Sequence, residues 1–331
     1  MAQILSKWNY TRGLHDIGNG CYAYLQPDGS WGWSNAGLVV DGGESLLVDT
    51  LFDCKLTREM LGAMRRAEPK AAAKIDTLVN THSNGDHCFG NELVAGAEII
   101  ASQACADEMR QDGGAKRLAE LQRSASRTDD TGMFLSRIFA PFDFEGINFT
   151  FPTKTFVGKI DCRVGDKTVQ LIEVGPAHTG GDVLAYVPQD RVIFTGDILF
   201  INGHPIIWAG PVGNWIKACD LMLGLDVETV VPGHGPITDK KGVAAVRDYL
   251  QYVAIEARRR YDAGMSIREA AEDISLTEYS SWSDAERIVV NVGTLYREFA
   301  AASGRPDAQG QSASPAELFA MMAQIEKRHR K

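Results

Sequence analysis

The stretch Asn80-Thr81-His82-Ser83-Asn84-Gly85-Asp86-His87-Cys88 places two histidines, an aspartate and an asparagine close together, directly after the mostly apolar run from Ile75 to Val79. That run predicts a buried strand. A loop at the carboxyl end of a strand can aim several side chains at one point, because the strand holds the backbone while Gly85 allows a tight turn. The stretch therefore indicates the beginning of a metal site.

Three later segments repeat the order of apolar run, turn and ligand-type residue. The residues that follow these runs are His178, Asp197 and His234. Imidazole and carboxylate groups are the ligands that borderline divalent metals prefer. Four loops are therefore expected to contribute to one metal centre.

At these residues the chain resembles the metallo-β-lactamase superfamily, whose core pattern is H-x-H-x-D-H, then a histidine, a bridging aspartate and a last histidine. The matching elements occur in the same order over roughly residues 15–240. One position departs from the pattern, because the family's second histidine is Asn84 here, which makes the motif H-x-N-x-D-H. The resemblance implies a four-layer αββα sandwich, and the two blocks of strands, each followed by helix, agree with two packed sheets covered by helices.

The chain is expected to divide into a metallo-β-lactamase-like domain over 1–238 and a C-terminal helical extension over 239–331. A flexible linker is predicted near 304–315, which is rich in Gly, Ser, Gln and Pro. Residues 103–140 are predicted to form a helical insertion near the active site. Two interpretations of that insertion stay open: a lid over the site, or a solvated helix pair with no catalytic role.

Local patterns predict strands over 33–40, 75–81 and 150–156 and a helix over 55–67. Asp49 lies at the end of a strand predicted over 45–49. The resemblance implies that it braces the metal loop, whereas its position alone fits a helix cap equally well.

Bulk properties exclude several classes of partner. The net charge of −9 argues against nucleic acid, because binding a phosphate backbone requires Lys and Arg to displace counterions. No apolar run approaches the roughly 20 residues that span a bilayer, and the first residues lack the pattern of a signal peptide. The 6 cysteines include no C-x-x-C pair and are expected to be reduced thiols. A cytoplasmic protein with no membrane partner is predicted.

The resemblance implies two metal positions that share one aspartate. Site one consists of His82, Asn84, His178 and Asp197, and site two consists of Asp86, His87, His234 and Asp197. An amide oxygen is neutral and a weaker donor to zinc than imidazole, so Asn84 is expected to weaken site one. Zinc is expected at site two, with site one weak, partly filled or occupied by a different metal such as iron or manganese.

The predicted function is a zinc-dependent hydrolase of a small organic molecule. Zinc lowers the pKa of bound water from about 15.7 to about 7, and the hydroxide attacks an ester, lactone, thioester or amide carbonyl, with a carbon–halogen bond kept open. Asp86 and Asp197 orient the nucleophile and accept a proton. Asn84, if it is not a ligand, donates to the developing oxyanion. His204 and Trp208, in the loop after Asp197, are predicted to contact substrate, with simple loop packing as the alternative.

Two further functions stay open. The first is a non-haem iron enzyme, because His82, His178 and Asp197 form a two-His-one-carboxylate set. The second is a non-catalytic metal-binding relative whose site has decayed at Asn84. The expected partner is a small-molecule substrate, and the helical extension is compatible with a homodimer.

Overall fold

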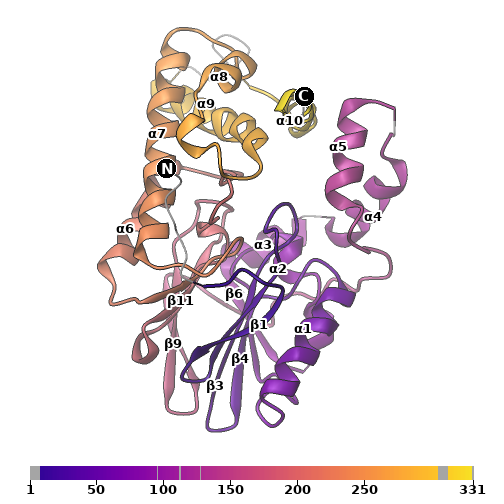
Figure 1. The fold of residues 1–331 in the computed structure, drawn as a ribbon, viewed down its shortest axis with the longest axis vertical. Helices are drawn as coiled ribbons and strands as arrows, with labels where there is room; N and C mark the ends of the chain where they lie inside the picture. The colour runs from indigo at the N-terminus through magenta and orange to yellow at the C-terminus, as the bar shows by residue number, and fades with distance from the viewer. Residues whose placement is uncertain (1–7, 95, 112, 127, 305–311, 330–331) are drawn as a thin grey trace.

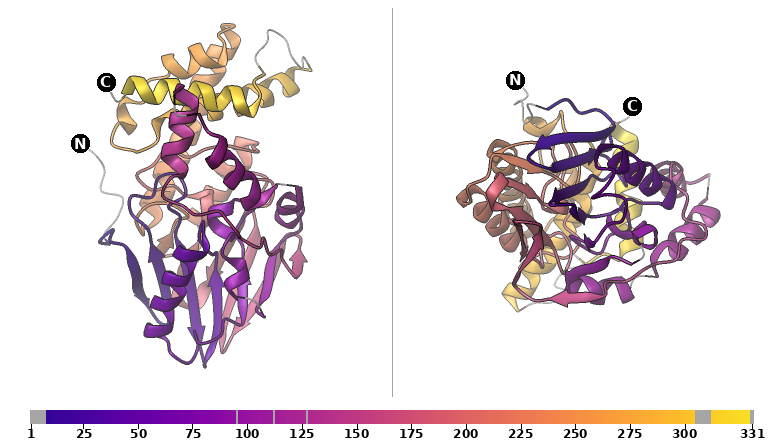
Figure 2. Two further views of the ribbon diagram at one scale, coloured as in Figure 1. Left: turned by 90° about the vertical axis from the view of Figure 1, so that its right-hand side faces the viewer. Right: turned by 90° about the horizontal axis from the view of Figure 1, so that it is seen from below.

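The computed structural model describes residues 8–94, 96–111, 113–126, 128–304 and 312–329. Two β-sheets pack face to face, and helices cover their outer faces (Figures 1 and 2). This arrangement confirms the predicted four-layer αββα sandwich with additional C-terminal helices. The strand ends meet at one edge of the sandwich, below the C-terminal helices in Figure 1.

The first sheet contains seven strands in the order β1-β2-β3-β4-β5-β6-β7. Their bounds are β1 Gly13–Gly18, β2 Cys21–Leu25, β3 Ala36–Asp41, β4 Glu44–Val48, β5 Thr77–Val79, β6 Glu98–Ser102 and β7 Lys154–Phe156. The pairs from β1 to β4 are antiparallel, and those from β4 to β7 are parallel. The strands predicted over 33–40, 75–81 and 150–156 form but are shorter than expected. β3 begins late because the backbone N–H of Asn35 donates to the Gly233 carbonyl at 2.7 Å instead of to a neighbouring strand. The side-chain amide of Asn35 holds the same loop by donating to the carbonyls of Pro232 and Gly235.

The second sheet contains five strands in the order β12-β11-β10-β9-β8. Their bounds are β8 Lys159–Val164, β9 Lys167–Glu173, β10 Val183–Val187, β11 Val192–Phe194 and β12 Thr229–Val231. Apolar side chains of both sheets form the layer between them, and Phe194 is among the buried residues there. A Cβ atom added to Gly37 of β3 would lie 2.3 Å from the Phe194 ring, so glycine allows the sheets to approach closely at this point.

The helices fall into three groups along the chain. On the first sheet lie α1 Cys54–Ala67, α2 Gly85–Cys88 and the 3₁₀ helix η1 Asn91–Val94; the insertion contains α3 Gln103–Gln111, α4 Gly114–Ser124 and α5 Asp130–Phe139. The second half contains η2 Pro188–Asp190, η3 Gly196–Ile198, α6 Val212–Gly224, α7 Lys240–Asp262, α8 Ile267–Asp273, η4 Thr277–Tyr279, η5 Ala285–Arg287, α9 Ile288–Ser303 and α10 Pro315–His329. The predicted helices over 55–67 and 103–140 therefore form. The proposed linker falls largely on residues 305–311, which lie outside the described residues, and the division into two domains stays a prediction.

Helix α10 lies across the top of the molecule between α5 and the pair α8–α9 (Figures 1 and 2). Lys327 pairs with Asp130 of the insertion at 2.7 Å, and Arg328 pairs with Glu272 of α8 at 2.8 Å. The last helix thus connects the insertion to the C-terminal helices. In the described ranges, no helix is both long and apolar enough to cross a membrane.

Candidate metal centre

The metal loop after β5 is held from behind by Asp49. This buried carboxylate accepts hydrogen bonds from the backbone N–H and the hydroxyl of Thr81, both at 2.7 Å, and lies 2.9 Å from Nδ1 of His87. The helix cap proposed as the alternative is provided by Asp53, which accepts from the Leu56 N–H at 2.7 Å. Asp49 therefore holds the metal loop in place through Thr81 and His87.

Gly85 does not make the tight turn that the sequence suggested. It is absent from the positive-φ glycines of the described residues and begins the short helix α2. A Cβ atom at Gly85 would lie 2.4 Å from the ring of Phe89, which is itself buried. Glycine is needed here because of side-chain packing, and a one-turn helix directs Asp86 and His87 inward.

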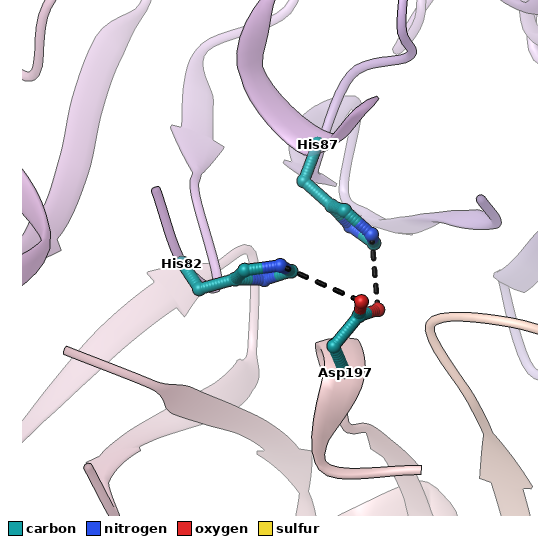
Figure 3. Close-up of side chains that lie close together, drawn as sticks. All are labelled: His82, His87 and Asp197. Atoms are coloured by element: carbon teal, nitrogen blue, oxygen red, sulfur yellow. Dashed lines mark ion pairs between the residues drawn. The ribbon is translucent and has the colours of Figure 1, made fainter. Parts of the chain in front are cut away.

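Four imidazoles converge on the carboxylate of Asp197. The Nε2 atom of His87 lies 3.0 Å from its Oδ1, and the Nε2 atoms of His178, His234 and His82 lie 3.3, 3.4 and 3.7 Å from its Oδ2. Figure 3 shows His82, from the segment after β5, and His87, from α2, pointing at Asp197 of η3. All five side chains are buried.

The predicted ligands form two compact groups of three. Possible ligand atoms of His82, His87 and Asp197, and those of Asp86, His87 and His234, lie within 4.8 Å of one another in each group. His87 belongs to both groups, whereas the sequence assigned it to the second site alone. Every predicted ligand lies in this cluster or, like Asn84 and His178, against it.

The donor atoms have the environment that a bound cation requires. Among the described residues, Nε2 of His82, Nε2 of His87 and Oδ1 of Asp197 are buried without a well-formed hydrogen bond, although the last two lie 3.0 Å apart as an ion pair. Buried polar atoms normally make well-formed hydrogen bonds, so a bound cation would complete the coordination of these three atoms. The donor set of imidazole nitrogens and carboxylate oxygens fits zinc or a similar divalent metal.

The opposite nitrogen of each imidazole is held by the protein. The Nδ1 atoms lie within hydrogen-bonding distance of Thr81 for His82 (3.0 Å), Asp49 for His87 (2.9 Å), the Ile206 carbonyl for His178 (2.7 Å) and the Gly29 carbonyl for His234 (3.0 Å). Such contacts orient each ring and present Nε2 to the centre.

Asn84 contacts a histidine of site one. Its Nδ2 lies 3.0 Å from Nε2 of His178. Because Nδ1 of His178 donates to the Ile206 carbonyl, Nε2 is the acceptor and the Asn84 amide is the donor. Cys88, next to the predicted ligands, instead directs its thiol to the carbonyls of Ser83 and Asn84, at 3.5 and 3.2 Å.

The charges of the cluster are strongly coupled. Burial alone lowers the pKa of His87, but the carboxylates of Asp197, Asp86 and Asp49 outweigh burial and hold that pKa well above its usual value. A similar balance raises the pKa of His234 to about 9. Burial raises the pKa of Asp197, but the surrounding histidines outweigh it and hold that pKa well below its usual range. The metal-free cluster therefore holds protons where a cation would bind.

A cavity of about 630 Å³ opens above the cluster. Its floor includes Asn84, Asp86, His178, Asp197 and His234, and its walls include residues of the insertion, the loop before β3 and α10. Helix α3 contributes Glu108, which accepts from Ser83 Oγ and from the Gly180 N–H, both at 2.8 Å. The insertion therefore lies beside the site, as the lid interpretation requires.

The structure separates the two predicted substrate contacts. Trp208 lines this cavity. His204 is fully buried and lines a different cavity, and its Nδ1 lies 3.1 Å from the Tyr249 hydroxyl. The chain turns away at Asn202, which has φ of 62°, and the His204 N–H bonds the Ser283 carbonyl. His204 thus packs against the C-terminal helices, which corrects its predicted position at the substrate.

Sequence reasoning missed most of the cavity wall. Trp31, Phe319 and Arg287 line the cavity, yet no spacing in the sequence connects them with the metal ligands. Only the aromatic content of α10 and of the segment around Trp31 could have drawn attention to them.

Comparisons with known proteins agree with this fold. The family model described as "Metallo-beta-lactamase superfamily" matches residues 29–234. The 2,4-dinitroanisole O-demethylase subunit alpha of Nocardioides sp. (strain JS1661) is 24% identical over 204 residues, which cover 60% of this chain and 51% of that protein. The hydroxyacylglutathione hydrolase of Methylococcus capsulatus is 22% identical over 216 residues, 62% of this chain and 68% of that protein.

A solved structure is similar over nearly the whole chain. The stereoselective inverting sec-alkylsulfatase Pisa1 from Pseudomonas sp. has a TM-score of 0.66 at 16% identity, covering 96% of this chain and 57% of its own. At this identity the likeness concerns the fold alone. Because it covers 96% of the chain, it extends into the C-terminal helices. The chain spans about half the length of the demethylase subunit.

Proposed function

Because this chain belongs to the metallo-β-lactamase superfamily, we propose that it is a metal-dependent hydrolase of a small organic substrate. The observation that carries the proposal is the convergence of four imidazoles on Asp197 at the floor of a cavity. The name of the hydroxyacylglutathione hydrolase supports the reaction class. The name of the O-demethylase subunit suggests that ether carbon–oxygen bonds should be screened as well as ester, lactone, thioester and amide bonds.

The metal would be held by His82, His87, His178, His234, Asp86 and Asp197. Zinc is the proposed ion because imidazole and carboxylate are its usual ligands, with iron or manganese as alternatives. A bound ion of this kind acidifies water and polarises the bond that is broken.

The chain's own groups would handle the proton and the developing charge. Asp86 lines the cavity and its Oδ2 lies 3.2 Å from His234 Nε2, so its carboxylate can orient water and accept a proton. Asn84 also lines the cavity, and its amide is already a hydrogen-bond donor. We propose that this amide donates to the substrate oxygen that gains negative charge.

Elemental analysis tests the proposal. The protein is purified without added metal, and zinc, iron and manganese per chain are measured for the wild type, Asn84→His and Asp197→Asn. About one zinc in the wild type, about two in Asn84→His and little in Asp197→Asn are expected. Asp53→Asn is the matched control, because Asp53 is a buried helix cap that bonds no residue of the cluster.

Turnover is then measured on esters, lactones, thioesters and aryl ethers. Hydrolysis by the zinc form that Asp197→Asn abolishes and Asp53→Asn keeps would support the hydrolase. Bound iron together with oxygen consumption would instead support the non-haem iron enzyme. If the protein binds no metal, both the hydrolase and the iron enzyme are ruled out. Size-exclusion chromatography of the same samples tests the predicted homodimer.

A further inference from the structure

The cavity above the metal cluster has one wall made of three aromatic rings from distant parts of the chain. Trp31 precedes β3, Trp208 follows η3, and Phe319 belongs to α10. The ring centroids of Trp31 and Trp208 are 6.4 Å apart, those of Trp31 and Phe319 are 6.3 Å apart, and those of Trp208 and Phe319 are 6.1 Å apart. All three side chains are half-buried and line the cavity, so they form one continuous aromatic surface.

The Trp31 ring of this wall is held by contacts on several sides. The Trp31 Nε1–H donates to Glu286 Oε1 at 2.9 Å, and the Arg287 guanidinium lies 4.6 Å from the Trp31 ring centroid. Phe134 of the insertion meets the same ring edge to face at 6.1 Å. Because the ring is fixed before a ligand arrives, little side-chain entropy is lost when one binds.

Arg287 does not give the wall a free positive charge. Its side chain is 2% exposed, and it pairs with Asp284 at 3.1 Å and donates to the His204 carbonyl at 3.0 Å. Its guanidinium also lies 5.2 Å from the Phe200 ring centroid. The charge of Arg287 is therefore compensated within the protein, and what the three rings themselves offer a ligand is an apolar aromatic surface.

The third ring depends on the C-terminal helix. Phe319 stacks on Trp208 with an interplanar angle of 26°. Helix α10 is held by the pairs of Lys327 with Asp130 and Arg137 with Glu326, which join it to α5. The wall is therefore complete only when α10 is docked on the insertion.

We propose that the substrate carries an uncharged aromatic ring that packs against Trp31, Trp208 and Phe319. A cavity of about 630 Å³ accepts a small molecule of this kind. Aromatic pairs favour offset-stacked or edge-to-face contacts, each worth roughly 2- to 12-fold in affinity. Bond breaking at the metal cluster rests on the proposed function, whereas binding of the ring does not.

Binding is tested first, with matched alcohols that the protein cannot hydrolyse. 1-Naphthol and decahydro-1-naphthol have the same carbon skeleton, but only the first is planar and aromatic. Isothermal titration calorimetry on the full chain is run with chelator, so that the more acidic naphthol hydroxyl cannot bind a metal ion, and should show at least about 10-fold tighter binding of 1-naphthol to the wild type. This preference should fall about 5-fold in Phe319→Leu and in Trp208→Leu. Phe151→Leu is the control, because Phe151 is 40% exposed and lies outside the cavity.

Turnover separates the inference from the proposed function. Benzyl acetate and cyclohexylmethyl acetate have leaving groups of similar basicity, so a difference in kcat/KM reports the ring. A preference for benzyl acetate that Phe319→Leu reduces would support both. Preferential binding of 1-naphthol with no hydrolysis of either ester would support the aromatic site and count against an esterase. Equal binding of the two alcohols to the wild type, or an unchanged preference in both wall variants, would overturn the inference.

Discussion

Asp49→Asn should weaken metal binding without unfolding the protein. The substitution keeps the shape of the side chain but removes the negative charge that lies 2.9 Å from Nδ1 of His87. Removing the hydrogen-bond partner of a metal-ligating histidine typically lowers the affinity for the metal by about 10- to 100-fold, which is roughly 1.4–2.7 kcal/mol of binding free energy. The contacts of Asp49 with Thr81, both at 2.7 Å, can be retained in part by the amide oxygen.

The metal-free protein should respond much less. Burial raises the pKa of Asp49 despite the opposing effects of His87 and Thr81. A folded-state pKa above the unfolded value means that the ionised carboxylate stabilises the fold less than the protonated form does, so this contribution is lost as the pH rises. A neutral amide avoids that burial penalty but loses a charge-assisted hydrogen bond of about 1.5–3 kcal/mol. The two effects oppose each other, and a net change within about 2 kcal/mol is expected.

Two measurements on the same variant separate these effects. Competition with a chromophoric chelator gives the zinc Kd, and urea unfolding in the presence of chelator gives the metal-free stability. Asp53→Asn, which keeps an oxygen for the cap of α1, should leave the zinc Kd unchanged. A zinc Kd of Asp49→Asn within 2-fold of the wild-type value would refute the proposed role of Asp49 as a brace. The carboxylate would then have no influence on His87, the ligand that it contacts.

Three further outcomes are expected. Chelation should lower Tm by several degrees, since metal at 100 times its Kd adds about 2.7 kcal/mol to stability; an unchanged Tm would mean that no resident metal is bound. Zinc added to metal-free protein at pH 7 should release about one to two protons into weak buffer. The reason is that the raised pKa values of His87 and His234 keep both rings protonated until metal binds. The proton release from His234 should fade as the pH rises through about 9. Gly85→Ala should destabilise the protein by about 1–3 kcal/mol in urea unfolding, because its Cβ would lie 2.4 Å from the Phe89 ring; stability equal to the wild type would show that the ring moves freely.

Much of the framework follows from local sequence pattern. The apolar run 75–79 contains the strand 77–79, and the run 229–231 is a strand throughout, because burial of alternating or continuous apolar residues is a local property. The ligand-type residues after these runs are predicted to belong to one metal centre. The structure brings them to one point because the strand ends lie at the same edge of the sandwich. Strand lengths are less predictable, since the backbone of Asn35 leaves the ladder only because the Gly233 carbonyl accepts its N–H.

The positions of single side chains in loops depended on the fold. The sequence predicts a tight backbone turn at Gly85. In the structure a glycine is required at this position for a different reason, because the Phe89 ring packs directly against its Cα. His204 follows Asp197 closely in sequence, yet Tyr249 of α7 and the Ser283 carbonyl draw it away from the cavity.

The order of the ligands, the two blocks of strands and the departure at Asn84 follow from the amino-acid sequence alone, because each is a property of neighbouring residues. The contact of Asn84 with His178, and the common wall formed by Trp31, Trp208 and Phe319, emerge only from the folded chain. The physical reason is that contacts between residues so far apart in the chain depend on how whole elements pack. Helix α10 reaches the cavity through its pairs with α5, which no local periodicity encodes.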